Sequence, residues 1–356
     1  MMKKSKLKTA VALAALSASS LPAFSQETIR LTIASGFPPV LPFVAEAVET
    51  FVPTVNEELA KTGNYEIKWT EAHAGSLVSS PEILQATTDG IVDIAVMGHV
   101  FEPAKLPLMN VGGAVPFGAT DIEVASETLI KLNHELPEFE AEWDAVNAVY
   151  LTGWANGNYY LLSTKPIETV EGLNGVKIGA TPGQFPWFTG IGAVGVTASY
   201  ATAYNDLSSG IYDVILTALA GAVAANLHEV APYVIETNLG AVNSGSIVVN
   251  KDKWGELPEE VQNALKVAAD AWLQGYYTRM ATLNESAMDA LEGGSATLVA
   301  FSDEERAKWA ASLPPLGKEW VARMEENGLP GQKVLTAYMD YLREHSDDVV
   351  RDWDKE

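Results

Sequence analysis

The chain has 356 residues, of which 47% are hydrophobic and 19% charged, a composition typical of a globular protein with enough length for two domains. Its formal net charge of −23 argues against binding to nucleic acid or to an anionic lipid surface. Because it contains no cysteine, disulfides, thiolate metal sites and cysteine nucleophiles are excluded.

The first 25 residues have the pattern of a secretory signal peptide. Lysines at positions 3, 4, 6 and 8 precede the apolar stretch 9–21, and small residues follow within 22–25. The apolar stretch is shorter than the roughly twenty residues that cross a bilayer. We therefore predict export to the periplasm, with cleavage near Ser25 and a mature chain that begins at Gln26.

Strand and helix patterns alternate through the first half of the mature chain. Apolar alternation and β-rich runs predict strands, and apolar residues at helical spacing predict helices, one of them with Pro81 in its first turn. The predicted strands are 29–35, 65–70, 91–97 and 148–154, and the predicted helices are 40–59, 81–86, 121–132 and 138–145. This βαβαβ order indicates an α/β lobe.

The second half of the mature chain also alternates strand and helix patterns, and it ends in predicted helices. The predicted strands are 176–180, 194–197, 212–216 and 245–250, with short helices at 185–191 and 202–209. A long helical pattern begins at Pro258 and ends at Gly293-Gly294, and at about 1.5 Å per residue it would extend about 50 Å, enough to cross two lobes. Residues 303–353 are expected to form amphipathic helices that cover the lobes.

The segment 190–195 matches the dinucleotide-binding pattern G-x-G-x-x-G. That pattern requires a preceding strand and a following helix, whereas this segment follows a predicted helix and enters a predicted strand. Without a helix N-terminus there is no group to receive a pyrophosphate. The glycines are better interpreted as a tight helix-to-strand turn.

No motif indicates catalysis. The five histidines form no short-spaced pair of the zinc-enzyme type, and the chain has neither a G-x-S-x-G elbow nor a P-loop. We predict a protein that is not an enzyme and that holds no metal or cofactor. His73 follows a predicted strand and could line a cleft, although a structural histidine explains it equally well.

Several segments, in order along the chain, resemble the solute-binding proteins of TRAP transporters. They are Asn156–Tyr160, Ser163–Ile178, Ala203–Asp213, Leu227–Tyr233 and Val249–Gln262. The resemblance implies a two-lobed α/β periplasmic binding protein, type II-like and hinge-linked, with the long helix spanning both lobes. It also implies delivery of a small-molecule ligand to TRAP membrane permease subunits driven by an ion gradient.

The expected division places the signal peptide at 1–25. Lobe I would comprise 26–150 with about 240–270, and lobe II 151–239 with about 271–356.

Within the resemblance, this chain departs from the family at the side chains expected in the ligand pocket. Members of the family usually carry a carboxylate-binding arginine at the position of Gly179, a second near Tyr159 and an asparagine at the position of Thr217. All remaining arginines of the mature chain are expected on the first strand, the long helix or the C-terminal helices, away from the cleft. They are Arg30, Arg279, Arg306, Arg323, Arg343 and Arg351. Lys105 and Lys177 remain as cations, but lysine lacks the planar fork of arginine.

Aromatic residues are frequent in the loops expected at the cleft, with Glu71, Glu82 or Glu102 nearby. An aromatic face and a carboxylate together suit an amine, although about half of these rings are expected in the core. The predicted ligand-binding residues are Phe37, His73, Phe101, Glu102, Trp154, Asn156, Tyr159, Gly179, Trp187, Tyr200 and Thr217.

The predicted ligand is a small neutral or cationic molecule, such as an amine or amino alcohol, rather than a C4-dicarboxylate or sialic acid. One alternative keeps the transport role but makes the ligand an organic acid held by neutral donors such as Asn156, Tyr159 and Thr217. Another alternative is a secreted hydrolase or lyase with an active site in the cleft.

Overall fold

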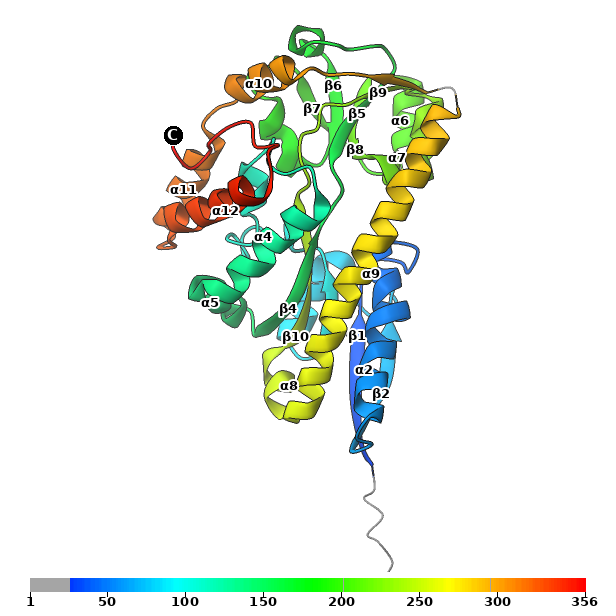
Figure 1. The fold of residues 1–356 in the computed structure, drawn as a ribbon, viewed down its shortest axis with the longest axis vertical. Coiled ribbons are helices and arrows are strands. Elements are labelled where there is room, and N and C mark those ends of the chain that lie inside the picture. The colour runs from blue at the N-terminus through cyan, green and yellow to red at the C-terminus, as the bar shows by residue number, and fades with distance from the viewer. Residues whose placement is uncertain (1–25, 201, 295) are drawn as a thin grey trace, which may run out of the picture.

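The structure, a computed structural model, describes residues 26–200, 202–294 and 296–356, so the predicted signal peptide lies outside it. Two mixed β-sheets form the centres of two lobes, and helices cover their faces (Figure 1). None of the helices in the described ranges combines the length and the apolar character needed to cross a membrane.

The sheet of the first lobe has the strand order β2-β1-β3-β10-β4. β1 runs parallel to β2 and β3, whereas β10 is antiparallel to β3 and β4. These strands are β1 (Glu27–Ala34), β2 (Tyr65–Ala72), β3 (Ile94–Met97), β4 (Ala148–Ala155) and β10 (Asn243–Asn250). Every residue of β3 and β10 is buried, as expected for strands with neighbours on both sides and helices on both faces.

Helices of the first lobe follow the predicted order. The predicted helix 40–59 is present but contains one turn of π-helix. Asp121 caps α4 by accepting the N–H groups of Glu123 and Val124, and Pro137 occupies the first turn of α5. The segments are α1 (Pro42–Glu46), η1 (Ala47–Phe51), α2 (Val52–Ala60), η2 (Ser80–Glu82), α3 (Ile83–Thr88), η3 (His99–Phe101), η4 (Val111–Ala114), α4 (Ile122–Glu135) and α5 (Pro137–Ala145).

The second sheet has the strand order β11-β9-β5-β8-β6-β7. Its strands are β5 (Tyr159–Ser163), β6 (Lys177–Ala180), β7 (Val194–Thr197), β8 (Val214–Ala218), β9 (Tyr233–Ile235) and β11 (Thr297–Val299). Short helices surround it, namely η5 (Val170–Leu173), η6 (Pro182–Phe188), α6 (Ala203–Ser209), α7 (Leu219–Ala224) and η7 (Leu227–Glu229). Strands β5, β9 and β11 were not predicted from the sequence.

The glycine-rich segment between η6 and β7 is a turn, as predicted. Gly190 and Gly192 have φ angles of 92° and 74°, a region that only glycine adopts readily. The helix before it differs from the prediction of 185–191, because η6 is a 3₁₀ segment at Pro182–Phe188. Pro186 lies inside it and cannot donate the hydrogen bond that an α-helix would need there.

The long helix α9 (Glu259–Glu292) confirms the prediction of one helix that spans both lobes. It follows α8 (Lys251–Glu256) and packs against α2, η1 and β4 in the first lobe and against α7 and β11 in the second (Figure 1). Where α9 meets η1 it carries Gly275, and a Cβ there would lie 2.4 Å from a carboxylate oxygen of Glu46. Glycine therefore lets this buried carboxylate approach the helix.

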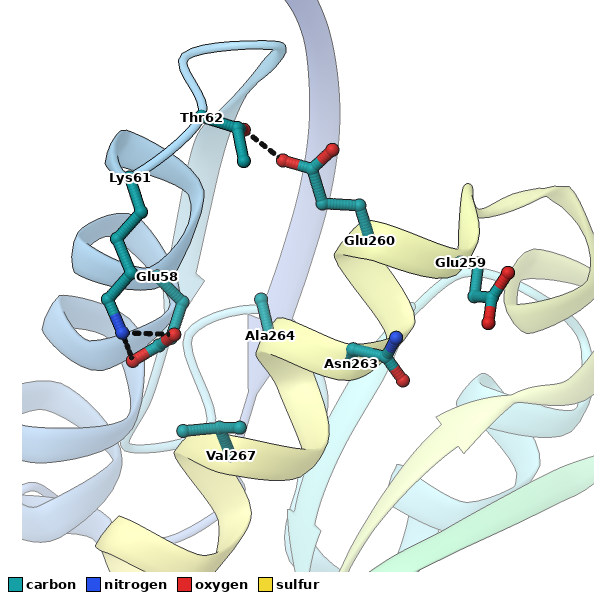
Figure 2. Close-up of a pocket in the computed structure, with 8 residues that line it drawn as sticks. All are labelled: Glu58, Lys61, Thr62, Glu259, Glu260, Asn263, Ala264 and Val267. Atoms are coloured by element: carbon teal, nitrogen blue, oxygen red, sulfur yellow. Dashed lines mark hydrogen bonds and ion pairs between the residues drawn. The ribbon is translucent and has the colours of Figure 1, made fainter.

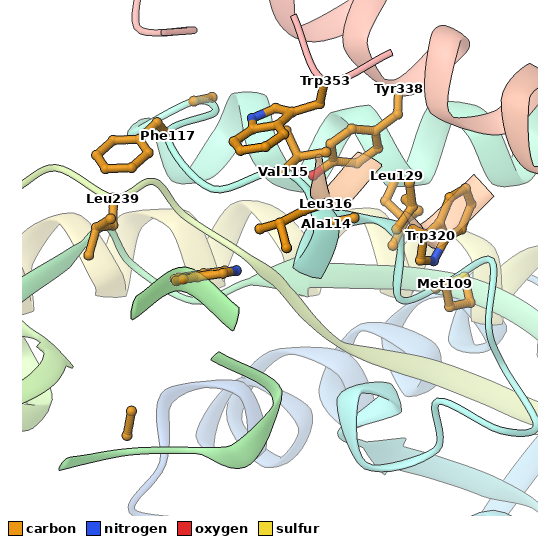
Figure 3. Packing of buried hydrophobic residues seen from close by; sticks show 14 of the residues in the cluster. Met109, Ala114, Val115, Phe117, Leu129, Leu239, Leu316, Trp320, Tyr338 and Trp353 are labelled. Atoms are coloured by element: carbon orange, nitrogen blue, oxygen red, sulfur yellow. The ribbon is translucent and has the colours of Figure 1, made fainter. Parts of the chain in front are cut away.

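The C-terminal helices do not all belong to the second lobe. In α10 (Asp303–Ser312), the Trp309 indole donates to the Trp187 carbonyl at 2.8 Å. By contrast, α11 (Leu316–Glu326) and α12 (Gly331–His345) pack on the first lobe, where the Tyr338 hydroxyl donates to Asn243 Oδ1 at 2.8 Å. The Trp353 indole, beyond α12, donates to the Pro116 carbonyl at 2.9 Å. Figure 3 shows Tyr338 and Trp353 packed near Val115 and Leu316, and the same buried cluster contains Trp187 and Trp309.

The observed boundaries therefore differ from the expected division. The boundary expected at residue 150 falls within β4, which pairs with β10 of the first sheet up to Ala155. The chain enters the second sheet only at Tyr159. The segment from about 271 onward, expected in lobe II, is shared between the lobes.

Candidate functional site

A cavity of about 590 Å³ lies where segments of the first lobe, the second lobe and α11 meet. Its size is within the range of about 300–1,000 Å³ that is common for small-molecule sites. Its lining comprises Val100, Phe101, Pro103, Pro107, Asn110, Gly113, Ala114, Asn156, Tyr159, Thr181, Pro182, Gly183, Gln184, Pro186, Trp187, Val242, Asn243, Ser244, Leu316, Glu319, Trp320, Arg323 and Met324.

The wall from the first lobe is the irregular segment 98–115. Glu142 of α5 fixes it from behind, because its carboxylate accepts the N–H groups of Leu108 at 2.6 Å and Met109 at 3.1 Å. The Asn110 amide donates to the carbonyl of Leu106 at 2.8 Å. Phe101 is 59% exposed, so this wall presents an aromatic ring to the cavity.

The wall from the second lobe consists of η6 and the start of β5. The Trp187 indole donates to the Gly113 carbonyl at 3.0 Å and therefore links η6 to the first lobe. Its ring packs edge-on against Tyr159, with ring centroids 6.2 Å apart. Burial raises the pKa of Tyr159, against the opposing effect of hydrogen bonds with Asn156 and Gln184, so its hydroxyl stays neutral.

The third wall is one face of α11. Leu316, Glu319, Trp320, Arg323 and Met324 line the cavity at the spacing of a single helical stripe. Glu319 and Arg323 are the only charged side chains in this lining. Neither belongs to an ion pair among residues 26–200, 202–294 and 296–356. The expectation that every arginine lies away from the cavity is therefore wrong for Arg323, because α11 folds back onto η4 instead of covering an outer face.

Four of the eleven predicted site residues line this cavity, namely Phe101, Asn156, Tyr159 and Trp187. Two more connect to it through a chain of aromatic rings. The ring centroids of Phe37 and Phe101 are 6.2 Å apart, and those of Phe37 and Phe43 are 5.4 Å apart. Phe43 in turn stacks on the buried Trp154 at 4.6 Å, so Trp154 belongs to the core.

The other five predicted residues lie outside the lining. Two are joined to each other, since the hydroxyl groups of Tyr200 and Thr217 are 2.7 Å apart. A Cβ at Gly179 would lie 2.8 Å from the Tyr212 ring, so that ring fills the space beside β6. His73 lies 3.8 Å from Glu71, and burial lowers its pKa more than Glu71 raises it. Glu102 pairs with Lys105 at 3.7 Å.

Sequence reasoning missed the α11 wall and the amides of Asn110, Gln184 and Asn243. The apolar residues at Leu316, Trp320 and Met324 do reveal an amphipathic helix in the sequence. They do not reveal which neighbour the helix contacts, and that neighbour decides whether Glu319 and Arg323 face solvent or a cavity.

A second hollow of about 450 Å³ lies between α2 and the first turns of α9 (Figure 2). Three of its four charged side chains are already engaged, since Lys61 pairs with Glu58 and Glu260 accepts from Thr62, and the fourth is the carboxylate Glu259. It lies at the end of the first lobe that is remote from the second sheet (Figure 1). We therefore do not regard it as the ligand site.

Glu142, which supports the first wall, gives a pH-dependent prediction. Desolvation raises its pKa from 4.5 to about 7, outweighing the two backbone N–H donors. A pKa raised on folding stabilises the protein below the unfolded pKa, and this contribution is lost as pH rises through about 7. We expect the unfolding free energy of wild type, relative to Glu142→Gln, to fall by on the order of 3 kcal/mol between pH 4.5 and pH 7.5. Urea titrations of wild type and Glu142→Gln between pH 4.5 and pH 7.5 measure this difference in unfolding free energy.

The matched control for that experiment is Glu140→Gln, which removes an exposed carboxylate from the same helix. A pH-independent difference between wild type and Glu142→Gln would contradict the prediction.

The family model described as bacterial extracellular solute-binding protein, family 7, matches residues 38–323. The chain belongs to this family. Family 7 members and the similar solved structures are solute-binding proteins, so this chain is a TRAP periplasmic solute-binding protein and not an enzyme. This finding removes the alternative of a secreted hydrolase or lyase.

Two relatives and one structure illustrate the range of the family. The C4-dicarboxylate-binding periplasmic protein DctP of Rhodobacter capsulatus is 23% identical, over 72% of this chain and 84% of its own. The ectoine-binding periplasmic protein TeaA of Halomonas elongata is 22% identical, over 74% of this chain and 77% of its own. A TRAP periplasmic solute-binding protein from Desulfovibrio salexigens has a TM-score of 0.79 and 19% identity, covering 89% of this chain and 97% of that one. The predicted two-lobed fold is thereby confirmed.

Proposed function

We propose that the cavity beside α11 is the ligand site of this family 7 protein. Its ligand would be a small organic solute without net negative charge, such as an amine or amino alcohol, rather than a C4-dicarboxylate. The observation that carries the proposal is the charge of the lining, where the single cation Arg323 is balanced by Glu319.

A ligand with two negative charges would find too few cationic side chains in such a site to neutralise them. Transfer of an unpaired carboxylate from water into a protein costs several kcal/mol. Strand β6 offers no side chain at Gly179, and Lys105 already pairs with Glu102. The remaining polar lining consists of neutral amides and hydroxyls, while the exposed ring of Phe101 offers aromatic surface to an apolar or cationic part of the ligand.

The two curated relatives do not decide the ligand. One is named for C4-dicarboxylates and the other for ectoine, at nearly equal identity to this chain. The charge of this chain's own cavity therefore supports the proposal more directly than either relative does.

A second candidate is an organic acid with one carboxylate. Arg323 favours it, because a guanidinium without an ion-pair partner in the described structure can bind a carboxylate with two parallel hydrogen bonds.

Ligand binding would serve transport through a shift in lobe arrangement. A solute that contacts both lobes favours the closed arrangement, and the closed protein is the form that would deliver it to the membrane permease subunits.

The experiment is a thermal-shift screen of residues 26–356, followed by calorimetry on each hit. A ligand bound only by the folded state at 100 times its Kd adds about 2.7 kcal/mol of stability. The panel contains amines, amino alcohols, polyols, amino acids, monocarboxylates and C4-dicarboxylates of matched size. We expect shifts from solutes without net negative charge. Strong shifts from succinate or malate, with the uncharged and cationic solutes silent, would refute the proposal, and monocarboxylate hits alone would establish the second candidate.

A further inference from the structure

We infer that α11 provides a two-charge clamp for a ligand with both an amino and a carboxylate group. Arg323 would bind the carboxylate and Glu319 the ammonium group, so the ligand class is a small zwitterion of amino-acid type. This inference rests on the proposed function and narrows it.

Neither Glu319 nor Arg323 uses its charge in an ion pair within the described residues. Glutamate and arginine four residues apart on a helix are placed to pair with each other. In the described structure no ion pair joins Glu319 and Arg323, although both belong to the stripe that faces the cavity. Two opposite charges that lie one turn apart without pairing can bind the two ends of a zwitterion.

Arg323 differs in this respect from three other arginines of the C-terminal region, Arg306, Arg343 and Arg351. Arg306 bonds to Asp303 and to the Asn238 carbonyl. Arg343 bonds to Asp340, Asp352 and Asp354, while Arg351 bonds to Glu356 and to two backbone carbonyls. Each of these guanidinium groups has a structural partner. Arg323 has none among the described residues, and it is the one that reaches the cavity.

The helix that carries the clamp, α11, is held firmly by its neighbours. Trp320 and Met324, on the same stripe, are almost fully buried. At Gly317 a Cβ would lie 2.2 Å from the Trp353 carbonyl, so the start of α11 is in close contact with the C-terminal segment. Because the helix is already fixed, only the exposed side chains of Glu319 and Arg323 have to lose conformational entropy when ligand binds.

The opposite walls determine the rest of the ligand. Tyr159, Asn156 and Gln184 are neutral, and Phe101 and Trp187 are aromatic. A side chain that is apolar or carries a neutral hydrogen-bonding group therefore fits, whereas a second carboxylate would find no cation in the described lining.

The test uses residues 26–356 and calorimetry with the common L-amino acids, β-alanine and γ-aminobutyrate, each beside its methyl ester and its N-acetyl derivative. We expect at least one free zwitterion to bind, with affinity at least tenfold weaker for Arg323→Gln and for Glu319→Gln. Esterification removes the carboxylate of the ligand, so Arg323→Gln should bind the methyl ester about as well as it binds the free zwitterion. N-acetylation removes the ammonium group, so Glu319→Gln should bind the N-acetyl derivative about as well as it binds the free zwitterion.

The matched controls are Lys318→Gln and Glu325→Gln, which remove one charge of each sign from the same helix but lie off the cavity stripe. They should bind like wild type. If amines or polyols bind and neither clamp variant weakens them, the inference is wrong and the proposed function stands. If only dicarboxylates bind, the inference and the proposed function are both wrong. Equal losses in the clamp and control variants would also overturn the inference.

Discussion

Trp187→Ala is expected to destabilise the protein by about 3–5 kcal/mol, the range for truncation of a large buried aromatic side chain. Only 1% of Trp187 is exposed, and its ring packs edge-on against Tyr159 within the second lobe. The substitution would also leave the Gly113 carbonyl without its indole donor. The free energy of unfolding from guanidinium chloride titration measures the loss.

The control is Val194→Ala on strand β7, where the side chain is 55% exposed, and we expect a change below about 0.5 kcal/mol. A loss at Trp187 as small as the loss at Val194 would show that the contact between η6 and η4 contributes little to stability.

Arg279→Ala is expected to cost about 3–5 kcal/mol, because it breaks an ion pair whose acidic member is buried. Glu46 is 4% exposed and accepts hydrogen bonds from Arg279 and Thr50. Without the guanidinium, the carboxylate would remain in contact with α9 uncompensated. The same unfolding titration applies.

The double variant Glu46→Gln/Arg279→Ala separates charge from packing. It removes the buried charge as well as its partner, so it should be more stable than Arg279→Ala alone. If the double variant is the less stable of the two, the loss comes from the packing of the arginine stem and not from an unpaired carboxylate.

The regular elements could be predicted where their pattern is local. Strand β7 lies where apolar alternation placed it, and α9 extends between the predicted proline and glycine boundaries. Strands β9 and β11 could not be predicted, because each has only three residues and depends on pairing with a distant segment. The π-turn in the first long helix has no sequence signal that we recognise.

The candidate site could be predicted only in part, for a related reason. Asn156 and Tyr159 lie where the chain crosses between the lobes, and Trp187 was predicted as an aromatic residue beside the cleft; all three line the cavity. Gly179 and Thr217 were expected from the family resemblance, but Tyr212 and Tyr200 occupy the space beside them. Arg323 depended on the direction in which the C-terminal helices fold back, which no local pattern encodes.

The attachment of α9 to both lobes also has a mechanical consequence. A helix packed against α2 at one end and α7 at the other cannot follow a change in the angle between the lobes unless it bends or slides along one of them. Helices bend gently over long radii when their hydrogen bonds lengthen slightly on one side. We therefore expect the elastic energy of bending α9 to limit how far the empty protein opens. The same energy reduces the net binding free energy of a ligand that closes the lobes.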